Sequence, residues 1–120
     1  MADAVLKLAG LNEPIRGFGG RPLPPLKDAQ GEPLPADEQL TLGNVLLNLV
    51  ATMDPEGKAK DIIVQRRVGD AIYAAMADGG TYDAGSIAVG LLRKAATQNK
   101  PGYRVLILGQ VWEAIGTGDD

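Results

Sequence analysis

Carboxylates supply most of the side chains in this sequence that could take part in catalysis or hold a metal ion. Asp54, Glu56, Asp61, Asp70 and Asp78 fall close together in the middle of the chain. Such groups could form a general acid/base pair or a site for a hard cation. No stretch has the alternating oxygen ligands and the closing Glu of an EF-hand loop. Asp54 and Asp78 fall at expected helix ends, so helix capping and turn formation explain them better than catalysis does.

Several residue types that carry out chemistry are missing. The sequence has no cysteine and no histidine, and Ser86 is its only serine. Disulfides, thiolate nucleophiles and a Ser-His-Asp triad are therefore excluded. The commonest general base and the commonest transition-metal ligand are absent as well. We therefore expect a protein that is not an enzyme and that holds no cofactor or metal.

One glycine-rich stretch, Gly17-Phe18-Gly19-Gly20-Arg21, could bring backbone N–H groups close to a phosphate. A phosphate-binding loop leads into a helix, usually with Lys-Ser or Lys-Thr after it. Here Pro22 follows, with more prolines behind it, so no helix begins. The pattern therefore predicts a tight turn.

Three small basic groups fall on or next to expected helices: Arg66-Arg67, Arg93-Lys94, and Lys100 with Arg104. They could bind nucleic acid or the acidic surface of a partner protein, but charged residues on a helix more often mark its solvated face. The net charge of −3 argues against nucleic acid, whose binders usually carry a basic excess. A regulator that binds nucleic acid, or a host polymerase or replication factor, remains the alternative hypothesis.

The candidate partner-binding residues are aromatic side chains and their neighbours, together with one basic pair. They are Phe18, Arg21, Leu23, Arg66, Arg67, Tyr103 and Trp112. Tyr and Trp are enriched at interface hot spots. In a chain with so few aromatic residues, however, Tyr73 and Trp112 are expected to serve first as internal anchors.

The elements that position these residues fall into two regimes. Over residues 1–40 we expect an extended Pro/Gly-rich arm or β-hairpin, because most of the prolines lie there. A unit recurs in it, first as Gly20-Arg21-Pro22-Leu23-Pro24 and then as Gly31-Glu32-Pro33-Leu34-Pro35, with a turn-like segment between. The glycines at 17–20 could turn a hairpin between residues 14–16 and 21–23.

Residues 41–115 are predicted to form a helical domain of about four helices. Thr41 is a plausible N-cap, and apolar residues follow it with helical spacing. Asp54-Pro55-Glu56 predicts the start of a second helix ending near Ala77, and Asp83 the cap of a third. Thr81-Tyr82-Asp83 reads as a connector or a short strand. The fold class is α+β, mainly α, and residues 116–120 are expected to be a disordered tail.

The last element, residues 103–115, has two readings. Val105-Leu106-Ile107-Leu108 could be a buried strand, whereas the longer window favours a helix that is apolar nearly all round. Such a helix needs cover on both sides, from its own domain or from a second subunit, so a homo-oligomer is predicted. The apolar run is too short to span a bilayer, and the N-terminus lacks the pattern of a signal peptide. We therefore expect no membrane association.

Five short pieces occur in a distinctive order. They are Gly19-Gly20-Arg21-Pro22-Leu23, Gly31-Glu32-Pro33-Leu34, Leu40-Thr41-Leu42-Gly43-Asn44-Val45-Leu46, Ala71-Ile72-Tyr73, and residues 105–115 from Val105 through Gly109-Gln110-Val111-Trp112 to Ile115. In this order they resemble a group of small proteins of tailed bacteriophages and prophages, with the pattern DGKPL…GEPLTLGDVL…KIY…PLVVGQVWELL. The sequence departs from that pattern at Gly19, where the group more often has Asp, and by an insertion around residues 34–40.

The resemblance brings no catalytic residues with it. It implies a bacteriophage origin. Our first hypothesis is a phage protein that binds other phage or host proteins, in tail assembly as a chaperone or as a minor structural component of the virion. A proline-rich arm on a helical body suits this role, because an arm that is already partly extended loses less entropy when it lies along a partner. The implied location is the cytoplasm of the bacterial host or the particle itself.

Overall fold

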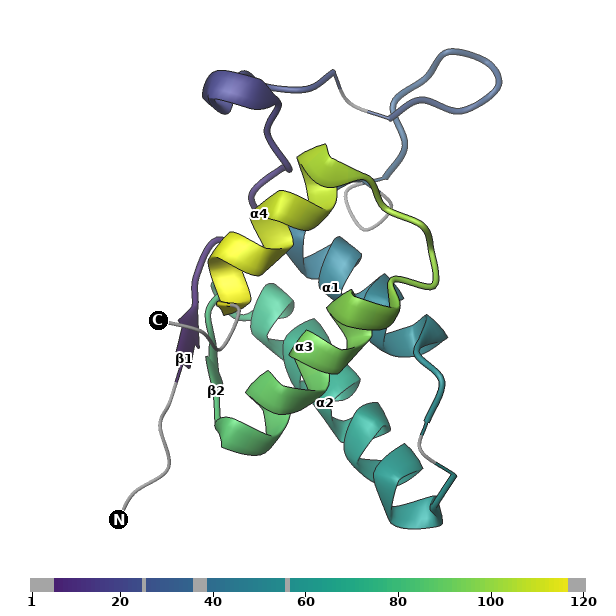
Figure 1. Ribbon diagram of the computed structural model, residues 1–120. Helices are drawn as coiled ribbons and strands as arrows, with labels where there is room; N and C mark the ends of the chain where they lie inside the picture. Colours follow the sequence, from purple (N-terminus) through teal and green to yellow (C-terminus); the bar gives the residue numbers. More distant parts are fainter. Residues whose placement is uncertain (1–5, 25, 36–38, 56, 117–120) are drawn as a thin grey trace.

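The computed structural model describes residues 6–24, 26–35, 39–55 and 57–116. It contains four helices: α1 (Leu42–Thr52), α2 (Ala59–Ala77), α3 (Ser86–Gln98) and α4 (Val105–Ile115). A two-stranded antiparallel sheet joins β1 (Leu6–Leu8) to β2 (Tyr82–Ala84), and a 3₁₀ turn, η1, spans Phe18–Gly20. The predicted class, α+β and mainly α, is confirmed (Figure 1).

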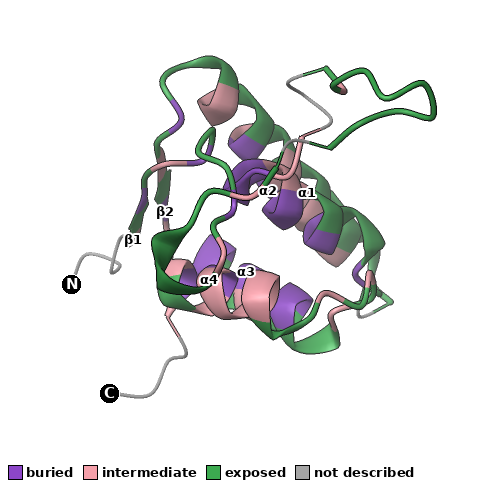
Figure 2. Cartoon of the chain, turned by 90° about the horizontal axis from the view of Figure 1, so that it is seen from above, coloured by how far each residue is buried: buried purple, intermediate pink, exposed green. Residues whose placement is uncertain are grey.

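Helix α1 is the most deeply buried helix and contacts the other three. Thr41 caps it as predicted, because its hydroxyl accepts the backbone N–H of Asn44 at 3.1 Å. The apolar residues with helical spacing all face the core: Leu42, Val45, Leu46, Leu49 and Val50. Figure 2 shows the buried side of α1 turned towards the other helices. The core is aliphatic, as the shortage of aromatic residues requires.

The beginning of the described chain packs into the helical body. Leu8, Leu11 and Ile15 are buried, and β1 runs alongside β2 from the middle of the sequence. The backbone N–H of Leu11 donates to the carbonyl of Gly80, and that of Gly43 donates to the carbonyl of Leu11. The boundary expected at residue 40 therefore does not separate two packing units, because residues 6–16 share one hydrophobic core with the helices.

The described residues of the range 16–40, which we call the projecting segment, leave this body and are largely exposed (Figures 1 and 2). Its first turn is the predicted one, with Arg16 bridged to Pro22 and the N–H of Gly17 donating to the carbonyl of Arg21 at 2.7 Å. Its second turn bridges Lys27 to Pro33 around residues 28–32. Part of the insertion noted in the sequence, residues 36–38, lies outside the described residues.

A side chain from the end of this segment holds the second turn. The Nε2 of Gln39 donates to the carbonyls of Leu26 and Leu34, and its Oε1 accepts the N–H of Leu26. In the same turn the carboxylate of Asp28 accepts the N–H groups of Gln30 and Glu32. The second turn therefore has a defined conformation although it buries little apolar surface.

The start predicted for the second helix is wrong. Helix α2 begins at Ala59, with Lys58 at the N-cap position, rather than at Asp54-Pro55. Asp54 is instead tied to the end of α3, where its N–H donates to the Oε1 of Gln98 at 2.8 Å and its carboxylate pairs with Lys100. These tertiary contacts hold the segment before α2 away from helical geometry. Glu56 lies outside the described residues.

Two further boundaries are resolved. Asp83 does not cap α3, because it lies within β2 and Gly85 takes the N-cap position. The reading of residues 105–108 as a strand is wrong, since they begin α4. Of the predicted tail, the structure describes Gly116 alone. Within the described ranges, no helix has the length and apolar character needed to cross a membrane.

Candidate protein-binding site

Helix α2 is the least covered helix of the fold. Of its nineteen residues, Val68 and Ile72 are buried. The side chains of Ile62, Ile63 and Tyr73 are 50%, 51% and 65% exposed. The sequence carries a partial signal for this, because the apolar residues of this stretch follow helical spacing less regularly than those of α1 do.

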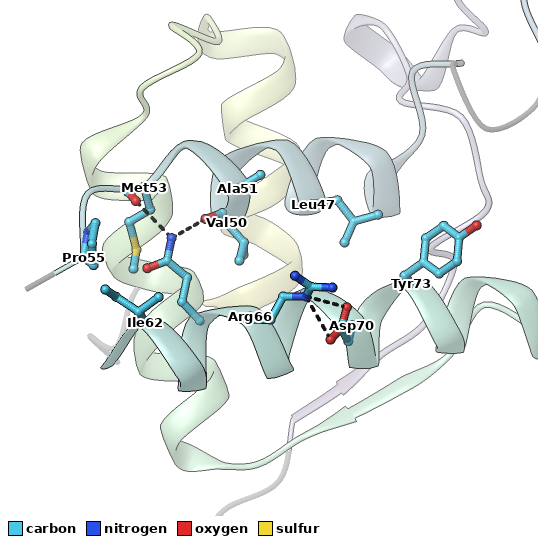
Figure 3. A pocket seen from close by; sticks show the side chains of 11 residues that line it. Leu47, Val50, Ala51, Met53, Pro55, Ile62, Arg66, Asp70 and Tyr73 are labelled. Carbon is cyan, nitrogen blue, oxygen red and sulfur yellow. Dashed lines mark hydrogen bonds and ion pairs between the residues drawn. The ribbon is translucent and has the colours of Figure 1, made fainter. Parts of the chain in front are cut away.

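A cleft of about 520 Å³ runs between α1 and α2 (Figure 3). Leu47, Val50 and Ala51 of α1 form one wall, and Ile62 and Tyr73 of α2 form part of the other. Met53 and Pro55 close the end at which α1 leads into α2. The lining is mainly apolar, which is typical of sites that bind apolar ligands or side chains of another protein.

One polar side chain reaches into this cleft from α2. The Nε2 of Gln65 donates to the carbonyls of Val50 at 2.6 Å and Met53 at 3.0 Å, at the end of α1. Its Oε1 is buried and has no hydrogen-bond partner. A buried acceptor without a donor costs about 1–3 kcal/mol. Because this oxygen is shielded from solvent, an occupant of the cleft can donate an N–H or O–H group to it only after the surrounding side chains move aside. We therefore take this cleft as the candidate functional site.

An ion pair lies in the cleft wall. The Nε of Arg66 contacts both carboxylate oxygens of Asp70, at 3.2 and 3.1 Å, one helical turn further on (Figure 3). Both side chains are largely exposed, so the pair contributes little to stability. Arg67, the other member of this basic pair, is exposed and does not line the cleft. The two arginines named from the sequence are therefore not equivalent.

The remaining predicted contact residues lie around α4 and the projecting segment. Phe18 is 76% exposed and shares a hollow with α4 residues Val105 and Gly109. Tyr103 and Trp112 are half-buried, and both pack against the core. The hydroxyl of Tyr103 also accepts from the Nδ2 of Asn48 at 2.9 Å.

The other two residues of the projecting segment differ in burial, since Arg21 is exposed and Leu23 is half-buried against the core. The expectation that Tyr73 is an internal anchor is wrong. It lies on the uncovered side of α2, where it is 65% exposed.

The basic groups do not meet on one face. The Nε of Arg93 donates to the carbonyl of Gly116 at 2.7 Å, and one of its terminal nitrogens donates to that of Ile115, so it holds the end of α4. Lys94 lines a different cleft, between α2 and α3, and Lys100 pairs with Asp54. No observation therefore adds support to the nucleic-acid hypothesis.

The carboxylates are spread over separate parts of the surface. Among the described residues, no group of three or more acidic side chains lies close enough together to hold a metal ion. Asp54 and Asp70 each form an ion pair with a basic side chain. Burial raises the pKa of the Tyr82 phenol, but this residue belongs to the small sheet and not to the cleft.

Comparison of this chain with protein-family models, curated proteins and solved structures returns no match. The resemblance to tailed-phage proteins thus rests on the order of the short sequence pieces. It remains a prediction, and the candidate site stands on its geometry alone.

Proposed function

We propose that this chain is a non-enzymatic protein of a tailed bacteriophage that binds other proteins during particle assembly, as a tail-assembly chaperone or a minor virion component. The single observation that carries the binding role is the apolar α1–α2 cleft with the unpartnered acceptor of Gln65 inside it. The phage context is supported by the sequence resemblance.

The chemistry of the cleft specifies its occupant as an apolar segment of another phage or host protein. Apolar walls favour aliphatic or aromatic side chains. The unpartnered Oε1 of Gln65 favours a segment that also carries one N–H or O–H donor to hydrogen-bond with it. A backbone amide or a Trp indole meets that need. Covering the exposed parts of Ile62 and Tyr73 would contribute about 1 kcal/mol each. Pairing the acceptor would remove its burial cost.

The projecting segment offers a second contact element to the same kind of partner. It is exposed, yet its turn is held by Gln39 and Asp28. A segment that is already ordered loses less conformational entropy on binding than a flexible one does. This is the property expected of an arm that lies along a neighbouring protein in an assembly.

The cleft can be tested with peptides selected from a random display library on the immobilised full chain. We expect the selected peptides to carry apolar anchors, and a synthetic one to bind in solution by calorimetry. Ile62→Asp and Tyr73→Asp should each weaken this binding at least roughly tenfold. Ile87→Asp is the matched control, because Ile87 is also exposed, at 71%, but does not line the cleft.

A second readout follows the acceptor itself. The NMR signal of the side-chain carbonyl carbon of Gln65 should shift when the peptide binds, because Oε1 gains a donor. Peptides that bind Ile62→Asp as tightly as the unchanged chain would show that binding occurs elsewhere. A bound peptide that leaves the Gln65 signal unmoved would show that this acceptor takes no part in binding.

The biological role is tested by capture from infected cells, with proteins identified by mass spectrometry. Virion or tail-assembly proteins captured by the unchanged chain and lost with Ile62→Asp support the proposal. Capture of polymerase or replication proteins would favour the regulator instead. Deleting all of residues 10–37 is unsuitable, because Leu11 and Ile15 belong to the core. Replacing residues 27–33 by Gly-Gly removes the turn alone, since Leu26 and Leu34 are already hydrogen-bonded.

A further inference from the structure

Helix α2 is held against the body unevenly along its length. Its buried side chains, Val68 and Ile72, lie at and beyond its middle. The leading half of α2, residues 59–67, contains no buried residue, although Val64 packs partly against the core. A segment with few buried apolar contacts opens at a low cost in free energy. The leading half is therefore expected to open more readily than the rest of the helix.

The difference in length between α1 and α2 explains this uneven burial. Helix α1 has 11 residues and α2 has 19. They run in opposite directions, since Gly43 at the start of α1 lies against Met76 near the end of α2. Gln65 then reaches Met53, the residue that ends α1. Residues 59–64 therefore extend past the end of α1, and the start of α2 projects beyond the other helices (Figure 1).

The N-terminal end of α2 adds little support of its own. Lys58 takes the N-cap position, and its side chain makes no capping hydrogen bond. A lysine side chain offers no acceptor to the first backbone N–H groups, and its positive charge is unfavourable at a helix N-terminus. Helix α1, by contrast, is capped by the hydroxyl of Thr41. The leading half of α2 is thus weakly held at its end as well as along its side.

Gln65 fastens the leading half to α1. Its Nε2 donates to the carbonyls of Val50 and Met53, which lie at the end of α1. The Oε1 of the same amide is buried without a donor. This unpaired acceptor opposes the closed position, because water or another donor reaches the oxygen once the helix moves away. The contact that closes the leading half therefore carries a cost that opening removes.

The leading half also forms a wall of two clefts. Ile62 lines the α1–α2 cleft, Val64 lines the cleft between α2 and α3, and Gln65 lines both. A movement of this segment therefore opens the α1–α2 cleft and uncovers the oxygen of Gln65 at the same time.

We propose that the leading half of α2 is a lid on the α1–α2 cleft. It comes away from the body, admits an apolar segment of a partner, and closes again over that segment with Gln65 as its latch. This inference rests on the proposed function for what enters the cleft, whereas the opening is a property of the free chain. It supplies the movement that a donor needs in order to reach the buried oxygen.

The opening is tested by hydrogen exchange, followed by NMR on the full chain without peptide. Turns that leave the body lose their support, and so short a helical segment is not stable in water by itself. We expect the amides of residues 63–67 to exchange roughly a hundredfold faster than those of residues 90–94. The second set is the matched control, because it occupies the same places in α3, a helix with buried side chains at Val89 and Leu92.

Two substitutions should move this exchange in opposite directions. Lys58→Asp supplies a capping oxygen and a negative charge at the N-terminus, so it should slow exchange at residues 63–67 roughly fivefold. Lys58→Ala supplies no capping oxygen and should have a much smaller effect. Gln65→Ala removes the latch and should speed this exchange at least roughly tenfold. Exchange at residues 90–94 should not change in any of these variants.

Entry is tested by the rate at which a selected peptide associates with the chain. Lys58 does not line the cleft, so Lys58→Asp should slow association by the same factor as exchange, because the peptide enters only the open form. Equal exchange at residues 63–67 and 90–94, or exchange that neither variant changes, would overturn the lid. Association that stays as fast in Lys58→Asp, although exchange is slower, would overturn it too. If no peptide binds, the proposed function fails, and the opening is still judged by exchange alone.

Discussion

Replacement of Gly43 by alanine tests whether the N-terminal segment is part of the core. Gly43 lies in α1, and a Cβ there would stand 2.9 Å from the carbonyl oxygen of Leu11 and 2.5 Å from the sulfur of Met76. The Leu11 oxygen has little freedom to move, because it accepts the N–H of Gly43 at 2.8 Å. The sulfur belongs to a half-buried, flexible side chain and can give way at some cost.

The magnitude follows from two opposing effects. Glycine to alanine within a helix stabilises by about 1 kcal/mol, whereas overpacking a core position costs about 1–3 kcal/mol. We therefore expect Gly43→Ala to lower the free energy of unfolding by about 1 kcal/mol and the melting temperature by about 3–6 °C. The matched control is Gly90→Ala in α3, where an added Cβ meets nothing within 4 Å. This variant should be more stable by about 0.8 kcal/mol.

Both variants are compared with the unchanged chain by urea unfolding and by thermal melting. The two substitutions should move the midpoint in opposite directions. A double-mutant cycle of Gly43→Ala with Met76→Ala should show a favourable coupling of about 1 kcal/mol, because the smaller side chain makes room for the new methyl group. If Gly43→Ala stabilises the chain as much as Gly90→Ala does, the packing of residues 6–16 against α1 and α2 is not as described.

Three further predictions concern helix ends and pH. Thr41→Ala removes the acceptor for the N–H of Asn44 and should lower the free energy of unfolding by about 1 kcal/mol. Thr41→Ser keeps a hydroxyl acceptor and should stay close to the unchanged chain. An equal loss of stability in the two variants would argue against a capping role. Arg93→Ala removes the donor to the carbonyl of Gly116 and should cost about 1–2 kcal/mol in urea unfolding, and an unchanged midpoint would contradict this. Burial raises the pKa of Tyr82 above its ordinary value of 10.0, so the phenol binds its proton more tightly in the folded state. The stabilisation that comes from this difference in pKa is fully present below pH 10.0 and is lost as the pH rises through the pKa of the folded state. The free energy of unfolding should therefore fall with rising pH in that range, and it should fall less steeply in Tyr82→Phe.

Much of the local structure could be predicted from the sequence. Thr41 and the apolar residues after it identify α1, the glycines around Phe18 identify the first turn, and the turn-like residues 27–31 identify the second. These features are local, because capping, helical periodicity and turn formation depend on residues a few positions apart. The irregular apolar pattern of α2 indicates in part that one side of this helix is uncovered, but nothing in the sequence indicates the cleft.

What required the tertiary structure depends on contacts between distant residues. The pairing of β1 with β2 joins segments more than seventy positions apart, and the start of α2 is displaced by contacts of Asp54 with the end of α3. The sequence does not indicate that the side-chain oxygen of Gln65 lacks a hydrogen-bond partner, because the burial of this side chain depends on how α1 and α2 pack. Composition alone determined an aliphatic core without cysteine or histidine chemistry. Which apolar side chains that core leaves uncovered was decided by the packing of the helices, since a helix can turn only one face towards its neighbours.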